Sequence, residues 1–323
     1  MAPVLLFSRF KTYAWLLGTV IMSRLIQGGT MNSGSVVIVT GASTGFGRLI
    51  AETAARNGYR VFATMRNITG KNAPAARELR EIAEREGLWL RAIELDVTND
   101  SSVERAVNEV IGEAGRVDVL VNNAGYGLMG VTEAVTIEQA QRIMDTNFFG
   151  AVRMNRAVLP HMRKQQSGLL IHISSGAGRI VVPSMGFYCA SKWALEALAE
   201  EYRYELAGQA IDSVIIQPGA YPTAVFGNIE RAADASRTNT YGLVNGLADR
   251  VTTLLNAAAK GDPQEIADVV LRTIETPFGQ RKLRQRIGSG SEGIIALNEL
   301  SEQVQKQLLS AFGMTEIAKG AST

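Results

Sequence analysis

The chain has 323 residues, 46% of them hydrophobic and 20% charged, so it can bury a sizeable core and is neither collagen-like, low-complexity nor disordered. Its 33 Lys and Arg against 31 Asp and Glu leave a net charge of +2, which is too small for nucleic-acid binding through a basic surface. One cysteine and two histidines exclude an intramolecular disulfide and a Cys/His zinc cluster, so we expect no metal and a reducing, cytoplasmic compartment.

Residues 1–35 form an extension that differs from the rest of the chain. The apolar run Ala14–Met22 holds nine residues, fewer than the roughly 20 of a membrane-spanning helix, so no span is expected. No convincing cleavage site comes after this run, which argues against export. Met31 leads directly into a predicted strand, and we favour it as the true start over a floppy or surface-packed extension.

From Val36 onward, short β-branched runs alternate with amphipathic stretches, which is typical of βαβ units and a mainly parallel sheet. The apolar runs are continuous, as expected when helices cover both faces of the sheet. The sequence therefore predicts an α/β, doubly wound parallel sheet of six or seven strands in a single domain over residues 36–290. The predicted strands are Val36–Thr40, Arg60–Met65, Trp89–Leu95, Val117–Asn122, Leu169–Ser174 and Ser213–Gln217, with Lys282–Ile287 as a further edge strand.

Helices are predicted in most of the gaps between these strands. The stretch Ala220–Gly261 breaks the pattern and indicates a mobile lid or insertion, at a place where α/β proteins keep ligand-contacting loops. Asp262 is expected to cap the helix after it, and residues 291–323 to form a helical tail. The predicted helices are Ala75–Glu86, Ser101–Ala114, Ile137–Gln166, Phe187–Ala207 and Leu297–Leu309.

A glycine-rich turn, TGASTGFG from Thr40 to Gly47, lies between the first predicted strand and a helix. Glycines in such a turn let the backbone approach a pyrophosphate, which free N–H groups and the positive end of the helix dipole then bind. The turn indicates a Rossmann-type dinucleotide site, the alternative being a tight turn without a ligand. The predicted contacts are Gly41, Ser43, Thr44, Gly45, Phe46 and Gly47.

The end of the second strand bears on which dinucleotide is bound. Domains that prefer NAD usually carry an acidic residue there for the ribose hydroxyls, whereas this chain has Met65 followed by Arg66. A neutral residue beside a guanidinium suits a 2′-phosphate, so NADP(H) is expected over NAD(H). The alternative is that Arg66 is a solvated surface cation.

Tyr188 and Lys192 lie four residues apart, which places both on one face of a predicted helix. A nearby cation favours the phenolate and moves the pKa of a tyrosine toward the working range of a base. Ser175 comes directly after a predicted strand, so its hydroxyl is expected at the carboxyl edge of the sheet, within reach of a reacting oxygen. Each feature alone is weak, but together with the glycine turn they indicate a catalytic site.

Other motifs occur in order along the chain: Asp96-Val97, Asn122-Asn123-Ala124-Gly125, Asn147 and Pro218-Gly219-x-x-x-Thr223. With the glycine turn, Ser175, Tyr188 and Lys192, they resemble the short-chain dehydrogenase/reductase family over nearly all of residues 36–223. The stretches around Asn123 and Arg66 look, more loosely, like its branch of retinol and hydroxysteroid dehydrogenases.

The resemblance implies roles for these residues. Tyr188 would exchange the proton with the substrate oxygen, Lys192 would lower its pKa and hold the nicotinamide ribose, and Ser175 would polarise the carbonyl or alcohol. Asn147 would hold a water that links Lys192 to solvent, the alternative being a helix-kink residue that bonds the backbone. Further implied cofactor contacts are Asp96, Val97, Asn123, Ala124, Gly125, Pro218, Gly219 and Thr223.

The expected function is an NADP(H)-dependent oxidoreductase that interconverts a primary or secondary alcohol and an aldehyde or ketone by hydride transfer. A cofactor-binding redox sensor without turnover is the alternative. Candidate pocket residues are mostly apolar and suggest a lipophilic substrate: Val182, Met185, Phe187, Tyr221, Val225 and Phe226.

Two reactive residue types are expected to take no part in the chemistry: Cys189 as an inert thiol and His172 as a core histidine. By similarity, we expect a homodimer or homotetramer formed through the helical regions Ile137–Gln166 and Phe187–Ala207.

Overall fold

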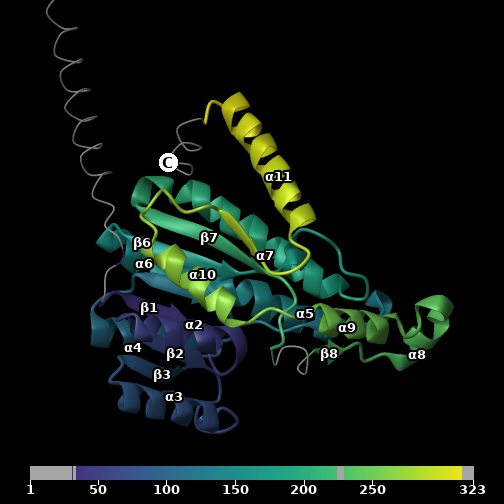
Figure 1. Cartoon of the computed structure of the whole chain (residues 1–323), viewed down its shortest axis with the longest axis horizontal. Helices are drawn as coiled ribbons and strands as arrows, with labels where there is room; N and C mark the ends of the chain where they lie inside the picture. Colours follow the sequence, from purple (N-terminus) through teal and green to yellow (C-terminus); the bar gives the residue numbers. More distant parts are fainter. Residues whose placement is uncertain (1–30, 32–33, 224–228, 315–323) are drawn as a thin grey trace, which may run out of the picture.

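The computed structural model describes residue 31, residues 34–223 and residues 229–314. The expectations for residues 1–30, Val225 and Phe226 lie outside this part. Within it, seven parallel strands form one sheet in the order β3-β2-β1-β4-β6-β7-β9 (Figure 1). The strands are β1 Val36–Val39, β2 Arg60–Met65, β3 Leu90–Glu94, β4 Val119–Asn122, β6 Gly168–Ile173, β7 Ile211–Pro218 and β9 Arg284–Ile287. The predicted doubly wound, Rossmann-type sheet is confirmed, and its strand order reverses between β1 and β4.

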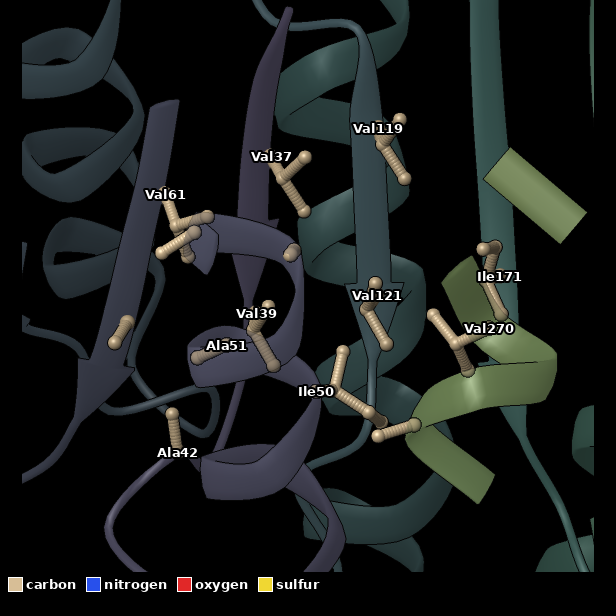
Figure 2. Packing of buried hydrophobic residues seen from close by; sticks show 14 of the residues in the cluster. Val37, Val39, Ala42, Ile50, Ala51, Val61, Val119, Val121, Ile171 and Val270 are labelled. Atoms are coloured by element: carbon tan, nitrogen blue, oxygen red, sulfur yellow. The ribbon is translucent and has the colours of Figure 1, made fainter. Parts of the chain in front are cut away.

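Two apolar cores lie on opposite faces of this sheet. Along β1, Val37 and Val39 point into one core and Val36 and Ile38 into the other, because successive strand side chains alternate. Figure 2 shows the first core, in which Ile50 packs among the valines of the sheet. The first face is covered by α2 (Gly45–Arg56), α3 (Ala73–Glu86) and α10 (Gln264–Glu275), and the second by α4 (Asp100–Ala114), α6 (Gly150–Gln165) and α7 (Gly186–Glu205).

The region predicted as one helix over Ile137–Gln166 is interrupted. It consists of α5 (Ile137–Met144), a π-helical turn η2 (Asp145–Phe149) and α6. Such a turn widens a helix by one residue and is frequent at functional sites. Asn147 lies in this turn and is buried, at 2% exposed.

The region predicted as a mobile lid or insertion contains helices that were not predicted. Its described part holds β8 (Glu230–Arg231), α8 (Ala235–Thr238), the 3-10 segment η6 (Asn239–Val244) and α9 (Leu247–Ala258), and β8 pairs with β5 (Leu128–Met129). One side of α9 packs on the body of the protein through Leu247, Val251 and Leu255, spaced four residues apart. This packing holds α9 over the region of Tyr188.

The C-terminal part begins after α9. The Asp262 carboxylate accepts a hydrogen bond from the Gln264 N–H at 2.9 Å, as a capping residue does, although Pro263 occupies the cap position itself. Helix α11 (Glu292–Ala311) extends away from the sheet in Figure 1. Among the described residues, no helix is both long and apolar enough to cross a membrane.

Candidate active site

The glycine turn after β1 has a backbone that side chains would block. Gly41 and Gly45 have φ angles of +67° and +58°, in the left-handed region that favours glycine. A Cβ on Gly47 would lie 2.3 Å from Asn123 Nδ2 and 2.5 Å from the Gly41 carbonyl oxygen. Thr44 precedes α2 without a side-chain cap, so N–H groups at the start of this helix are left for an anion. This bare backbone fits the pyrophosphate of a dinucleotide.

Thr40 fastens this turn to the end of β4. Its Oγ1 accepts hydrogen bonds from the N–H groups of Asn123 at 2.9 Å and Ala124 at 3.0 Å. The Asn123 amide returns to the turn, donating to the carbonyls of Thr40 at 2.8 Å and Gly41 at 3.1 Å. Two predicted cofactor contacts, Asn123 and Ala124, therefore lie against the glycine turn. Thr40 is the first residue of the TGASTGFG motif, but its hydrogen bonds to the end of β4 were not predicted, because they depend on a distant part of the chain.

The end of β2 carries an exposed cation. Arg66 forms no ion pair with the described residues, and the neighbouring Met65 is 2% exposed. The loop after Arg66 is shaped by Glu94, whose carboxylate accepts from the N–H groups of Asn67 and Ile68, both at 2.7 Å. The described structure therefore leaves the Arg66 guanidinium available to a ligand.

Two of the predicted cofactor contacts, Asp96 and Val97, come just after the end of β3 and differ in exposure, Asp96 being half-buried and Val97 buried. Asp96 Oδ1 accepts from the Thr98 N–H at 3.0 Å and from its hydroxyl at 2.7 Å, which orients the carboxylate at the end of β3. Val97 is 7% exposed and packs in the second core, next to Gly150. The Val97 side chain is thus a core residue, which leaves its backbone for contact with a cofactor.

Ser175, Tyr188 and Lys192 come together at the carboxyl edge of the sheet. Ser175 lies just beyond β6, and its side chain forms a hydrogen bond with Tyr188 in the first turn of α7. Lys192 Nζ lies 5.9 Å from the centroid of the Tyr188 ring and donates a hydrogen bond to the Ile173 carbonyl at 2.8 Å. The three side chains that the sequence separates by up to 17 positions thus form one cluster.

The pKa of Tyr188 shifts in the direction opposite to the one predicted from the sequence. Burial raises the pKa of Tyr188, and the hydrogen bond from Ser175 opposes this shift without cancelling it. Burial lowers the pKa of Lys192 to about 8. The prediction that a neighbouring cation brings the pKa of Tyr188 downward is therefore wrong for the protein alone, because loss of hydration outweighs the other influences. Tyr188 is a phenol at neutral pH and can donate a proton.

Asn147 makes the backbone contacts of a kink residue. Its Oδ1 accepts from the Tyr126 N–H at 3.0 Å, and its Nδ2 donates to the Tyr126 carbonyl at 3.0 Å and to Ser191 Oγ at 3.1 Å. A Cβ on Gly125 would lie 3.0 Å from Asn147 Oδ1 and 3.7 Å from Lys192 Nζ. Asn147 and Lys192 therefore lie on the same side of Gly125, another predicted cofactor contact.

The other titratable candidates are buried and inert. His172 is 0% exposed, and burial, aided by the charge of Lys192, lowers its pKa to about 3, so it is neutral at physiological pH. Burial raises the pKa of Cys189, whose Sγ lies 3.3 Å from the Val182 nitrogen as a hydrogen-bond acceptor. Both residues are as predicted, a core histidine and an unactivated thiol.

An apolar cluster adjoins Tyr188. Met185 and Val182 pack with Met129 of β5 and Val251 of α9, and Tyr188 itself borders the group. Phe187 belongs to a neighbouring cluster under α5, which Tyr188 also borders. These contacts place three of the predicted pocket residues next to the phenol.

Tyr221 was wrongly predicted to line the pocket. It is 2% exposed in the first core, where its ring packs edge-on against Phe46 at 5.7 Å and its hydroxyl donates to Glu265 at 2.8 Å. An aromatic residue in a loop can pack into the core as readily as into a pocket. Here Glu265 of α10 accepts the hydrogen bond of the buried hydroxyl.

The segment after β7 returns to the glycine turn. Pro218 ends β7, and the Gly219 N–H donates to the Ile287 carbonyl at 2.8 Å. A Cβ on Gly45 would lie 3.9 Å from Thr223 Cβ. Thr223 thus lies beside the turn, as a contact to the cofactor requires.

A family model described as short chain dehydrogenase matches residues 35–234. The chain belongs to this family. As a short-chain dehydrogenase it is an oxidoreductase enzyme, and the redox-sensor alternative is not favoured.

Individual relatives agree with the retinol dehydrogenase-like branch. The chain is 40% identical to 3-ketodihydrosphingosine reductase of Bacteroides thetaiotaomicron over 193 residues, which is 60% of this chain and 66% of the relative. It is 33% identical to retinol dehydrogenase 8 of Bos taurus over 272 residues, 82% of this chain and 85% of the relative.

Solved structures agree with the fold. A short-chain dehydrogenase from Streptomyces avermitilis has a TM-score of 0.71 at 31% identity, over 87% of this chain and 98% of the other. A metagenomic short-chain oxidoreductase in complex with NADP has a TM-score of 0.62 at 26% identity, over 79% of this chain and 96% of the other. The structural relatives of this short-chain dehydrogenase thus include a nicotinamide dinucleotide complex.

Proposed function

We propose that this short-chain dehydrogenase is an NADP(H)-dependent reductase of lipophilic ketones or aldehydes, and that Tyr188 is its acid/base. The observation that carries the proposal is the convergence of Ser175, Tyr188 and Lys192 at the sheet edge that also holds the glycine turn. In doubly wound folds, ligands bind at this edge where the strand order reverses.

Each residue of the cluster has a distinct task in this proposal. When bound, the nicotinamide supplies or accepts the hydride. The Tyr188 hydroxyl gives its proton to the substrate oxygen as that oxygen gains charge, and Ser175 donates a hydrogen bond to the same oxygen. Lys192, held by the Ile173 carbonyl, provides a positive charge that stabilises the phenolate left on Tyr188. Asn147 fixes the π-turn to the Tyr126 backbone, and in this proposal it also holds a water that passes protons between Lys192 and solvent.

Tyr188 is protonated at neutral pH, so we expect carbonyl reduction to be faster than alcohol oxidation at that pH. A general acid must hold its proton when substrate binds, and the raised pKa of Tyr188 meets that condition. Alcohol oxidation requires a deprotonated phenol, so we expect its rate to rise toward alkaline pH.

The preference for NADP(H) rests on the end of β2. A 2′-phosphate there would meet the exposed Arg66 guanidinium, whereas the neighbouring Met65 offers ribose hydroxyls no carboxylate. We propose that the cofactor also contacts the other residues predicted for it: Gly41, Ser43, Thr44, Gly45, Phe46, Gly47, Asp96, Val97, Asn123, Ala124, Gly125, Pro218, Gly219 and Thr223.

The lipophilic substrate is supported by the apolar cluster of Val182, Met185, Met129 and Val251 beside Tyr188. An apolar pocket with a few polar groups at one end is the usual form of a site for such molecules. The names of two relatives, a 3-ketodihydrosphingosine reductase and a retinol dehydrogenase, point to the same substrate class.

Consumption of NADPH with a matched carbonyl panel tests this function. Retinal, 3-ketodihydrosphingosine and a long-chain 2-ketone would be compared with pyruvate and acetone. We expect kcat/KM to be highest for the lipophilic members. Equal rates for small polar carbonyls would contradict the substrate class, and tight NADPH binding without turnover of any member would favour the sensor alternative.

We also infer a homodimer or homotetramer in which the regions of α5, α6 and α7 meet a second copy. Large apolar side chains are exposed there, with Ile137 at 66%, Phe149 at 47% and Trp193 at 45%. Light scattering would show a dimer or tetramer, and Trp193→Glu is expected to shift it toward the monomer. A wild-type monomer at micromolar concentration would contradict the inference.

A further inference from the structure

A buried carboxylate, Glu196, lies one helical turn beyond Lys192 on α7 and is 2% exposed. Its Oε1 accepts from Ser174 Oγ and from Gln217 Nε2, both at 2.8 Å, and its Oε2 accepts from Arg284 Nε at 3.0 Å. These partners lie after β6, on β7 and on β9. Burying a carboxylate is costly unless it is paired and hydrogen-bonded, and these bonds meet that condition while they connect α7 to three parts of the sheet.

One of these bonds reaches the backbone that carries Ser175. Ser174 immediately precedes Ser175, and the 3-10 turn η3 (Gly176–Gly178) comes directly after it. A Cβ on Gly178 would lie 2.6 Å from Glu196 Oε1 and 2.8 Å from Ser174 Oγ, so this turn folds directly over the carboxylate. Glu196 therefore contacts both sides of the Ser175 turn, through its bond to Ser174 and its close approach to Gly178.

The Glu196 carboxylate also affects Lys192, on the same helix. Lys192 and Glu196 lie at i and i+4 on α7, and the charge of Glu196 raises the pKa of Lys192 against the effect of burial. Among the described residues, the other titratable groups facing Lys192 are Tyr188 on the same helix and the neutral His172 on β6. Glu196 is thus the nearby negative charge that favours the protonated amine.

We infer that Glu196 is a positioning residue for the reduction proposed above, because it joins the Ser175 turn and the Tyr188/Lys192 helix through one buried carboxylate. It acts through Ser174 and Lys192 and touches neither substrate nor cofactor. The expected change in kcat rests on the proposed function. The expected loosening of the Ser175 turn rests only on the hydrogen bonds of Glu196.

Glu196→Gln and Glu200→Gln form a matched pair that tests it. Glu200 lies one turn further on α7 and pairs with the same Arg284, at 2.5 Å, but its bonds reach Tyr204 rather than the Ser175 turn. We expect Glu196→Gln to lower kcat about 10- to 100-fold, since small misplacements of catalytic groups have effects of that size. Its KM for NADPH should stay near the wild-type value, and Glu200→Gln should change neither constant.

Two further readouts separate positioning from general loss of stability. The alkaline limb of the pH profile of kcat should move to lower pH in Glu196→Gln. The substitution removes the negative charge of Glu196, which raises the pKa of Lys192 in the wild type. Ser174→Ala removes the bond to the turn and keeps the charge, so it should lower kcat without moving this limb. It also keeps the inference testable should Glu196→Gln fail to fold.

Hydrogen exchange in the protein without cofactor gives a test independent of turnover. The amides of Ala177 and Gly178 bond to Ser175 at 3.1 Å and 2.9 Å, and they should exchange faster in Glu196→Gln than in Glu200→Gln. Equal exchange, or equal kcat in the two variants, would overturn the inference. If wild type reduces no carbonyl, the proposed function fails, and the exchange comparison still decides the role of Glu196.

Discussion

Gly47→Ala is the sharpest test of the cofactor turn, because the structure fixes what the added methyl group meets. Its Cβ would lie 2.3 Å from Asn123 Nδ2 and 2.5 Å from the Gly41 carbonyl oxygen, where at least 3.0 Å is needed. Moving Asn123 breaks its two hydrogen bonds to the turn, at about 1 kcal/mol each. Overpacking against the Gly41 backbone adds about 1–3 kcal/mol. The expected loss in free energy of unfolding is about 3–5 kcal/mol.

Urea denaturation and NADPH titration measure the two consequences of this substitution. We expect a lower unfolding midpoint and, in the folded variant, at least tenfold weaker NADPH binding, because the displaced turn no longer fits a pyrophosphate. Gly112→Ala is the control: it lies within α4 with nothing within 4 Å of the added Cβ, so it should stabilise the helix by about 0.5–1 kcal/mol. If Gly47→Ala keeps both its midpoint and its affinity, the assignment of the turn is refuted.

Three other predictions concern the phenol, the cation and the buried histidine. Tyr188→Phe should lower kcat about 10²- to 10⁴-fold while NADPH binding, followed by fluorescence, stays nearly unchanged; a variant with wild-type turnover contradicts the acid/base role. Arg66→Ala should raise KM for NADPH about tenfold or more and leave KM for NADH unaltered; equal changes for both cofactors refute the 2′-phosphate contact. His172 has a folded pKa of about 3, below its ordinary 6.5, so the unfolded chain binds more protons between these values and stability falls as pH drops from 6.5 toward 3. His172→Gln should flatten this fall in urea denaturation, and parallel curves for the two proteins would contradict it.

The strands were predictable because their signal is local. Runs such as Val36–Val39 and Leu169–Ile173 are β-branched or apolar at nearly every position, which suits a strand buried on both faces. Helix α9 gave no comparable signal, since Leu247, Val251 and Leu255 form a meaningful stripe only against Met129 and Met185, which are far away in the sequence. For the same reason Tyr221 was misplaced, because its partners Phe46 and Glu265 come from other elements.

By itself, the sequence determined the order of the elements, the glycine turn and the spacing of Tyr188 and Lys192 on one helix face, because these depend on neighbours along the chain. Only the tertiary structure decided which distant groups surround them. The clamp of Thr40, the π-turn at Asn147 and the contacts of Glu196 all arise from elements that the sheet brings together. The direction of the pKa shift at Tyr188 was decided in the same way, because burial is a property of the packed protein and no residue pattern expresses it.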